Sequence, residues 1–454
     1  MSHPLPTVGP NRLRSARTEA CALVALAWPV AVAQVGGLCM GLVDTWMVGR
    51  LGAIELAAVA LGDACYFTLH VFAMGLILAL QPLISQAYGA GDAARCGATW
   101  RCGLRLALLL ALPLALLVSR GIPWALARAE LDPFVVRTAA DYLAPRALGI
   151  LPHLLFVAHR AFFNALGSTR PAMAVTLLAL VANAVLDWAL IFGRWGLPAL
   201  GVAGSGLATA LCNVLMLAGL SWWIARPRYR PYLAGGGASL ALLGRVVRLG
   251  LPIGLSHMLE VGAFAATSTF MGWLGIAALA SHQIALKMAS TSFMLAIALG
   301  TATSIRVGNA IGAGQTRAAQ RATWTGLGLG TAGMGCAAVV FLVAGKPIVS
   351  CFTADAEVVA LGTRLLAVAA AFQLSDGIQG IAAGALRGAG DTTSPFVAQL
   401  VGHWAVGVPA AYLLAFVCEG GPLAVWWALA GGLTVTALLL LGWARRIASA
   451  RALD

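Results

Sequence analysis

The sequence predicts an all-α polytopic membrane protein with about twelve transmembrane helices, arranged as two pseudo-symmetric six-helix lobes around a central cleft. Three observations support this fold class. Of 454 residues, 60% are hydrophobic and only 10% are charged, apolar runs of spanning length recur along the chain, and the two halves resemble each other. A soluble protein cannot bury so much apolar surface, so a membrane must be the solvent.

Twelve apolar runs are each long enough to cross the hydrocarbon core of a bilayer. Because the number is even, both termini should lie on the same side. Residues 1–18 form a polar, Arg-bearing tail without a cleavage-site pattern, so we expect no cleaved signal peptide. The approximate centres of the runs are Ala31, Phe67, Leu110, Leu151, Leu180, Leu211, His257, Met294, Gly330, Ala371, Val406 and Leu433.

The basic residues alternate by loop along the chain. If the N-terminus is cytoplasmic, twenty of the 29 Lys and Arg residues fall in inner segments and five in outer loops. The positive-inside rule then places both termini in the cytoplasm. The net charge of +13 does not indicate nucleic-acid binding, because the basic residues are not gathered on one face. The nine cysteines show no close paired spacing that would favour disulfides or a zinc site.

An internal repeat organises the chain. Residues 28–92 align with residues 251–315 at a constant shift of 223 without a gap, and Pro29 falls on Pro252. The loop Gly89-Ala90-Gly91 falls on Gly312-Ala313-Gly314. We therefore predict a duplicated six-helix unit in parallel orientation. The predicted boundaries are an N-terminal tail 1–18, an N-lobe 19–224, a cytoplasmic linker 225–240, a C-lobe 241–444 and a C-terminal tail 445–454.

Four acids lie inside apolar spans: Asp44, Asp187, Glu260 and Asp376. An acid in hydrocarbon costs a few kcal/mol, so each is a candidate functional residue. Glu260 follows Pro252 by about two turns, and the carbonyls that this proline frees suit a cation. At the shift of 223 none of the four acids recurs, which disfavours a purely architectural role.

Asp376 shares a helical face with Phe372 and Gln379, and we expect this face to line the cleft. Asn183 and Asp187 are four residues apart and form a polar face, for which interhelical hydrogen bonding and ligand contact remain equally open.

Asp44 shares a face with Gly37 and Gly41, although an outer helix end is an alternative reading. Lys287 is the one lysine within an apolar span, and we hypothesise that it pairs with Glu260 or Asp376 rather than snorkelling to an interface. We assign none of the histidines a role in carrying protons.

An ordered set of motifs carries a family resemblance over nearly the whole chain. The first two are Gly41-Leu-Val-Asp-Thr-Trp-Met-Val-Gly49 and Pro252-Ile-Gly-Leu255, which leads to Glu260. They are followed by Ser281-His-Gln-Ile-Ala-Leu286, Ser304-Ile-Arg-Val-Gly-Asn-Ala-Ile-Gly312 and Leu386-Arg-Gly-Ala-Gly-Asp-Thr392. Together they resemble the multidrug and toxic compound extrusion (MATE) transporters, in particular the NorM-like branch.

The resemblance implies a secondary transporter, not an enzyme, that exports organic, often cationic and amphipathic compounds by Na⁺- or H⁺-coupled antiport with alternating access. We expect a monomer in contact with membrane lipid that binds no nucleic acid, and we expect no cofactor beyond the coupling ion. The resemblance also implies a multi-pass protein of the bacterial inner membrane. The implied cation-coupling residues are Glu260, Asp376 and Asp44, with Na⁺ as a candidate ligand of Glu260 and Asp376. The residues that we expect to contact substrate or line the cavity are Asn183, Asp187, Gln283, Lys287, Phe372 and Gln379.

Three residues depart from the NorM-like pattern and leave the choice between Na⁺ and H⁺ open. Phe372 stands where Tyr can occur, Asp187 where Asn is usual, and Lys287 where Asn is common. Losing a Tyr oxygen should weaken Na⁺ coordination, and Lys287 would compete with a bound cation.

Two other functional classes remain as alternatives. One is a lipid-linked precursor flippase or metabolite exporter of the same superfamily. The other, more remote, is an intramembrane enzyme, although no G-x-S-x-G or H-E-x-x-H signature is present in the spans.

Overall fold

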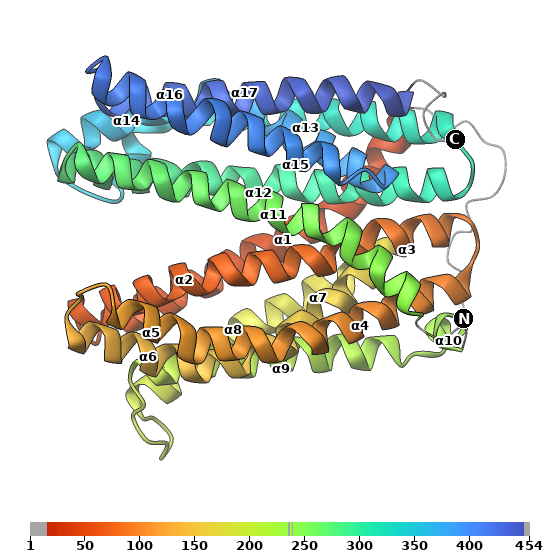
Figure 1. Cartoon of the computed structure of the whole chain (residues 1–454), viewed down its shortest axis with the longest axis horizontal. Coiled ribbons are helices and arrows are strands. Elements are labelled where there is room, and N and C mark those ends of the chain that lie inside the picture. The colour runs from red at the N-terminus through yellow and green to blue at the C-terminus, as the bar shows by residue number, and fades with distance from the viewer. Residues whose placement is uncertain (1–15, 235–236, 238, 449–454) are drawn as a thin grey trace. The chain divides into compact units, whose positions relative to one another are not determined.

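The structure, a computed structural model, describes residues 16–234, 237 and 239–448, and within this part every regular element is a helix (Figure 1). The first half of the chain contains α1 (Ala16–Gly49), α2 (Ala53–Leu78), α3 (Leu80–Gly89), α4 (Ala93–Leu116), the π-helix η1 (Leu117–Gly121), α5 (Ile122–Ala127), α6 (Pro133–Leu148), α7 (Ile150–Ala165), α8 (Arg170–Phe192) and α9 (Val202–Ile224).

The second half begins with two short elements, the 3₁₀-helix η2 (Pro227–Tyr229) and α10 (Arg230–Leu233). It continues with α11 (Leu240–Trp273), α12 (Ile276–Gly312), α13 (Thr316–Ser350), α14 (Ala356–Ala389), α15 (Thr393–Gln399), the π-helix η3 (Leu400–Gly407), α16 (Val408–Tyr412), the π-helix η4 (Leu413–Val417) and α17 (Gly421–Ala448).

The predicted spans are found as helices. Within the described residues, eleven helical stretches are long and apolar enough to cross a membrane, and they contain all the predicted centres except Leu151. That span consists of α6 and α7, which are separated at Gly149. A Cβ atom at Gly149 would lie 2.8 Å from the Cα of Ala210 on α9, so close packing requires glycine here. The side-chain amide of Asn213 donates to the Gly149 carbonyl oxygen at 3.3 Å, which satisfies an acceptor at the break.

The internal repeat is visible in the helix boundaries. The helices α2, α4, α6 and α8 begin at residues 53, 93, 133 and 170, and α12, α13, α14 and α15 begin at 276, 316, 356 and 393, each 223 residues later. The repeated glycine loops share a backbone conformation, since φ is +75° at Gly91 and +69° at Gly314. Residues with side chains rarely adopt this left-handed conformation, which explains why glycine recurs there.

The described residues divide into two compact units that do not follow chain order. Unit 1 contains the described residues up to Trp28, the segment Pro82–Ala93 and the described residues from Ala263 onward. Unit 2 contains Pro29–Gln81 and Ala94–Gly262. Consequently α1 begins in unit 1 and continues in unit 2 from Pro29, while α11 begins in unit 2 and continues in unit 1 from Ala263.

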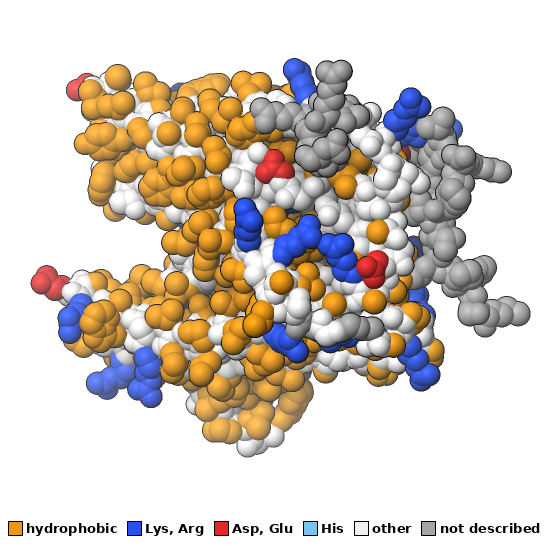
Figure 2. All heavy atoms as spheres, turned by 45° about the vertical axis from the view of Figure 1, so that its right-hand side comes forward, with side chains coloured by type: hydrophobic (Ala, Val, Ile, Leu, Met, Phe, Trp, Pro, Cys, Tyr) orange, Lys and Arg blue, Asp and Glu red, His pale blue; other side chains and the backbone are white. Residues whose placement is uncertain are grey.

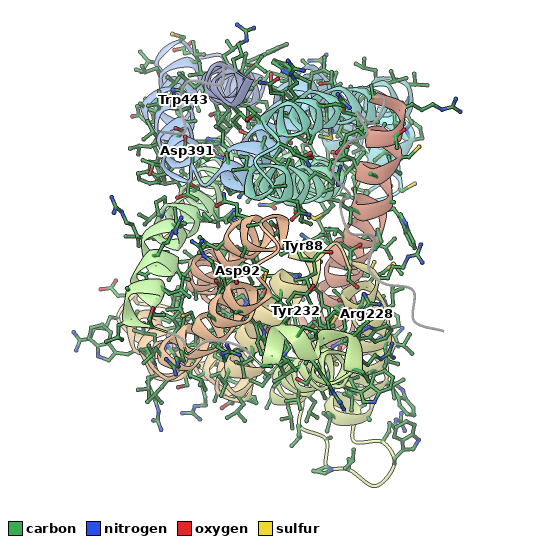
Figure 3. The ribbon with its side chains drawn as sticks, turned by 90° about the vertical axis from the view of Figure 1, so that its right-hand side faces the viewer. Tyr88, Asp92, Arg228, Tyr232, Asp391 and Trp443 are labelled. Carbon is green, nitrogen blue, oxygen red and sulfur yellow. The ribbon has the colours of Figure 1, made fainter. Side chains whose placement is uncertain are left out.

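Close backbone packing holds the segment Pro82–Ala93 within unit 1. The side-chain amide of Gln86 donates to the carbonyl oxygen of Gly388 at 3.0 Å. A Cβ atom added at Gly312 would overlap the backbone of Gln86, so α3 and α12 approach as closely as glycine allows. Tyr88 and Asp92 mark this segment in Figure 3.

The exterior of the protein is apolar, as a lipid-facing surface requires. Hydrophobic side chains cover much of the face drawn in Figure 2. Large apolar residues such as Leu112 and Val343 are exposed by 68% and 79% on helices of spanning length. In water such a surface would drive aggregation, whereas hydrocarbon tails solvate it. The chain is therefore a multi-pass membrane protein.

Candidate functional site

Two acids predicted from the sequence meet within unit 2. Asp44 lies on α1 and Asp187 on α8; both are buried, and Asp187 has no exposed surface. Their carboxyl groups are within hydrogen-bonding reach of each other. Within the described part of the chain, neither carboxylate oxygen of Asp187 has a hydrogen-bond donor. Because two ionised carboxylates cannot hydrogen-bond to each other, a shared proton would supply the missing donor.

Polar side chains of α8 and α9 complete the surroundings of this acid pair. The Thr209 hydroxyl on α9 lies 3.2 Å from Oδ2 of Asp44 and 3.1 Å from the Ser205 carbonyl oxygen, and its single hydrogen serves both acceptors. Asn183 lies one turn before Asp187, is fully buried, and makes no side-chain hydrogen bond to any described residue. An amide without partners is costly in a low-dielectric interior. The cluster thus offers carboxylate, amide and hydroxyl oxygens to a proton or a small cation.

A second charged group lies in unit 2, between α2 and α6. Arg146 on α6 donates from Nη2 to Oδ1 of Asp63 on α2 at 2.9 Å, and the Tyr142 hydroxyl donates to the same oxygen at 3.2 Å. The guanidinium carbon of Arg146 lies 4.5 Å from the ring centre of Tyr66 and 5.3 Å from that of Tyr142. The aromatic rings stabilise this largely buried cation through cation–π interactions, whereas the side chain of Asp63 is 45% exposed.

Glu260 lies on the part of α11 that belongs to unit 2. Its carboxylate is partly buried and lies 4.0 Å from Nδ1 of His257, one turn earlier. Asp376 belongs to unit 1, so the joint role of Glu260 and Asp376 in one cation site stays a prediction.

Asp376 is buried on α14 together with the two residues predicted to share its face, Phe372 and Gln379. The amide of Gln379 donates to Oδ1 of Asp376 at 2.9 Å. Phe372 stacks on Trp426 of α17, with ring centroids 5.8 Å apart. This face therefore combines a carboxylate with an aromatic wall, whereas its predicted contact with a cleft stays a prediction.

A buried hydrogen-bonded chain adjoins Phe372 in unit 1. Trp426 Nε1 donates to Nδ1 of His282 at 3.1 Å, and Nε2 of His282 lies 3.0 Å from the Ser268 hydroxyl. Because the indole can only donate, Nδ1 of His282 must accept, which fixes the proton of the neutral ring on Nε2. His282 therefore has both ring nitrogens occupied.

The two remaining predicted residues, Gln283 and Lys287, are exposed on α12. Lys287 and Asp376 both belong to unit 1, and their predicted pairing stays a prediction. Pairing with Glu260, which belongs to unit 2, stays a prediction.

Sequence reasoning overlooked Asp63 and Thr209 and gave Arg146 no role. Asp63 lies in the second apolar span and met the same criterion as the four selected acids. Arg146 follows Tyr142 by one turn inside an apolar span, which was a second usable signal. Thr209 carries no charge, so only the fold connects it to Asp44.

A family model and several curated proteins match this sequence over most of its length. The MatE family model matches residues 29–189 and 252–413, two stretches whose starts are 223 residues apart, like the repeat. A probable multidrug resistance protein NorM of Mesorhizobium japonicum is 37% identical over 95% of this chain and 94% of its own length. The probable NorM of Pseudomonas putida is 39% identical over 93% of both chains.

Solved structures show the same twelve-helix fold. An outward-facing multidrug resistance MATE family transporter of the MOP superfamily superposes with a TM-score of 0.88 at 20% identity, covering 95% of this chain and 96% of that one. A eukaryotic MATE transporter superposes with a TM-score of 0.85 at 22% identity, covering 96% and 99%. The chain therefore belongs to the MatE family, the multidrug and toxic compound extrusion transporters, in its NorM-like branch.

Proposed function

We propose that this protein exports organic, often cationic and amphipathic compounds by alternating access, in exchange for an inward-moving Na⁺ or H⁺. The observation that carries the proposal is the buried carboxyl pair of Asp44 and Asp187. Two acids that share a site inside an apolar bundle need a proton or a cation to offset their charge. Relatives named as multidrug resistance proteins support the substrate class.

Coupling requires that the cation and the substrate prefer different conformations of the protein. A cation on Asp44 and Asp187 removes one negative charge of the pair and favours one state, and its release restores negative charge that favours binding of a cationic substrate. Glu260 and Asp376 are retained in the proposal as further cation ligands.

The proposed location is the bacterial inner membrane with both termini in the cytoplasm. The excess of basic residues in the predicted inner segments supports this orientation. Within unit 1, the beginning of α1 and the end of α17 lie at the same end of the bundle, as an even number of spans requires (Figure 1).

The test is efflux of a fluorescent organic cation such as ethidium from proteoliposomes under separately imposed Na⁺ and H⁺ gradients. The variants are Asp44→Asn, Asp187→Asn, Glu260→Gln and Asp376→Asn, with Asp141→Asn, an exposed acid on α6, as the matched control. We expect the first two variants to lose gradient-driven efflux at least tenfold and the control to keep it. Full gradient-driven efflux in both Asp44→Asn and Asp187→Asn would refute the assignment of coupling to this pair.

A further inference from the structure

The proposed coupling mechanism leaves the largely buried guanidinium of Arg146, whose side chain is 15% exposed, without a role. Its Nη2 is bound to Asp63, but Nε and Nη1 are buried and have no hydrogen-bond partner among the described residues. An unsatisfied buried donor is unfavourable, more so when it carries charge. The guanidinium is thus held in unit 2 although the carboxylate of Asp63 accepts a hydrogen bond from only one of its three nitrogens.

The α9 helix connects Arg146 with the acid pair. Gly206 packs so tightly against α6 that a Cβ atom there would lie 3.2 Å from the backbone nitrogen of Arg146. Thr209, one turn further along α9, binds Asp44. Arg146 interacts electrostatically with both Asp44 and Asp187. One guanidinium therefore acts on three carboxyl groups, and it is in contact with only one of them, Asp63.

The other polar groups near Arg146 are uncharged partners or a further cation. On α2, the Tyr66 hydroxyl lies 3.2 Å from Nδ1 of His70, whose ring packs against His153 of α7 with centroids 4.7 Å apart. His153 in turn contacts Asn213 of α9 at 3.1 Å. Arg160, also on α7, is the further cation, and a proton on either imidazole would be repelled by it and by Arg146. We therefore assign the binding of the proton or Na⁺ to the carboxyl groups and not to the imidazoles.

Charge counting shows what Arg146 does to the acid pair. A fixed positive charge stabilises ionised carboxylates and repels an incoming proton or Na⁺, so it weakens cation binding at Asp44 and Asp187. Asp63 opposes this effect, because its negative charge offsets the guanidinium that it holds. Arg146, held by Asp63 and interacting electrostatically with the acid pair, is thus a charge that can act on how readily the pair releases a cation.

Resting on the proposed coupling role of Asp44 and Asp187, we propose that Arg146 is a tethered countercharge that sets the cation affinity of this pair, with Asp63 as its competing partner. Arg146 is a positioning and affinity-setting residue and need not contact the transported substrate. Its consequence is that emptying the pair leaves a net charge of −2 on the four groups Asp44, Asp187, Asp63 and Arg146, instead of the −3 that the three carboxylates alone would carry.

The test measures the proton or Na⁺ concentration that gives half-maximal ethidium efflux in proteoliposomes. Arg146→Met should lower this concentration about tenfold or more, because a neighbouring opposite charge typically shifts a carboxyl equilibrium by one to three pH units. Asp63→Asn should raise it, because the full charge of Arg146 then acts on the pair. Arg146→Lys should lie nearer to wild type, and Arg137→Met, an exposed arginine of the same helix, should match wild type.

The shifts expected for Arg146→Met and Asp63→Asn have opposite signs, and this distinguishes an effect on cation affinity from a purely structural role. A residue that only stabilises the fold would lower yield and thermal stability without moving the half-maximal concentration. If Arg146→Met does not fold, the test depends on Asp63→Asn alone, which must then raise the half-maximal cation concentration. Unchanged values, or shifts of both variants in one direction, overturn the inference while leaving gradient-driven efflux intact. Absence of cation dependence in the wild type overturns the proposed function and this inference with it.

Discussion

The buried ion pair between Glu19 and Arg306 gives the sharpest stability prediction. Nε and Nη2 of Arg306 donate to Oε1 and Oε2 of Glu19, each at 2.7 Å. The Glu19 side chain is 4% exposed and that of Arg306 is 18% exposed. The pair fastens the first turn of α1 to α12 within unit 1. Removing one partner of such a buried pair leaves an unpaired charge and costs about 3–5 kcal/mol.

The perturbation is a double-mutant cycle of Glu19→Gln, Arg306→Met and their combination. Unfolding entropy averages about 2.1 cal/mol/K per residue in soluble proteins, or roughly 1 kcal/mol/K for a chain of this length. A membrane protein that keeps its helices on unfolding has a smaller entropy, so each single variant should melt at least about 3–5 °C below wild type.

The assay is thermal unfolding of the purified protein in detergent, with the exposed Arg17→Met as the matched control. We expect the double variant to melt no lower than either single variant, because neither charge is then left alone. Melting decrements that simply add, or single variants that match Arg17→Met, would refute the account of a coupled buried pair.

Two further predictions concern packing. Trp426→Phe keeps a ring against Phe372 but removes the hydrogen-bond donor to His282, so it should destabilise the protein by about 1–3 kcal/mol. Trp427→Phe, at an exposed position, should leave stability unchanged. Equal melting temperatures of the two variants would contradict this prediction. Gly206→Ala places a Cβ atom within contact of the Tyr142 carbonyl oxygen and should lower stability and folded yield. In Gly431→Ala the added Cβ atom meets no other atom within 4 Å, so this control should be neutral or stabilising. A higher folded yield of Gly206→Ala than of Gly431→Ala, measured as the monodisperse peak in size-exclusion chromatography, would contradict close packing of α6 against α9.

The sequence was sufficient to predict the spans and the repeat, because both follow from local signals. Apolar length identifies a spanning helix, and glycine loops at Gly91 and Gly314 mark the same left-handed turn in each copy. The break at Gly149 could not be predicted from length, because α6 and α7 form one apolar run. Only packing against Ala210 and the Asn213 hydrogen bond reveal it.

The membership of the two units was beyond sequence reasoning. A contiguous chain suggests contiguous lobes, yet residues 16–28 pack in unit 1 while α1 continues in unit 2. Glu19 and Arg306 are 287 positions apart, and no local pattern relates them. The site shows the same limit: the acids Asp44 and Asp187 were identifiable as intramembrane charges, whereas Thr209 joins them only through the fold.

The repeat gives a reason for expecting unequal roles of the two copies. At the shift of 223, Asp44, Asp63, Arg146 and Asp187 correspond to Thr267, Leu286, Ala369 and Ala410, so none of the four charges of the unit 2 cluster recurs. Gly149 corresponds to Phe372, and the helix broken at Gly149 is continuous in α14. Since buried charges without a function are costly in hydrocarbon, drift would remove them from a copy that does not use them. A duplicated scaffold that keeps this cluster in one copy therefore gives its two halves unequal buried charge.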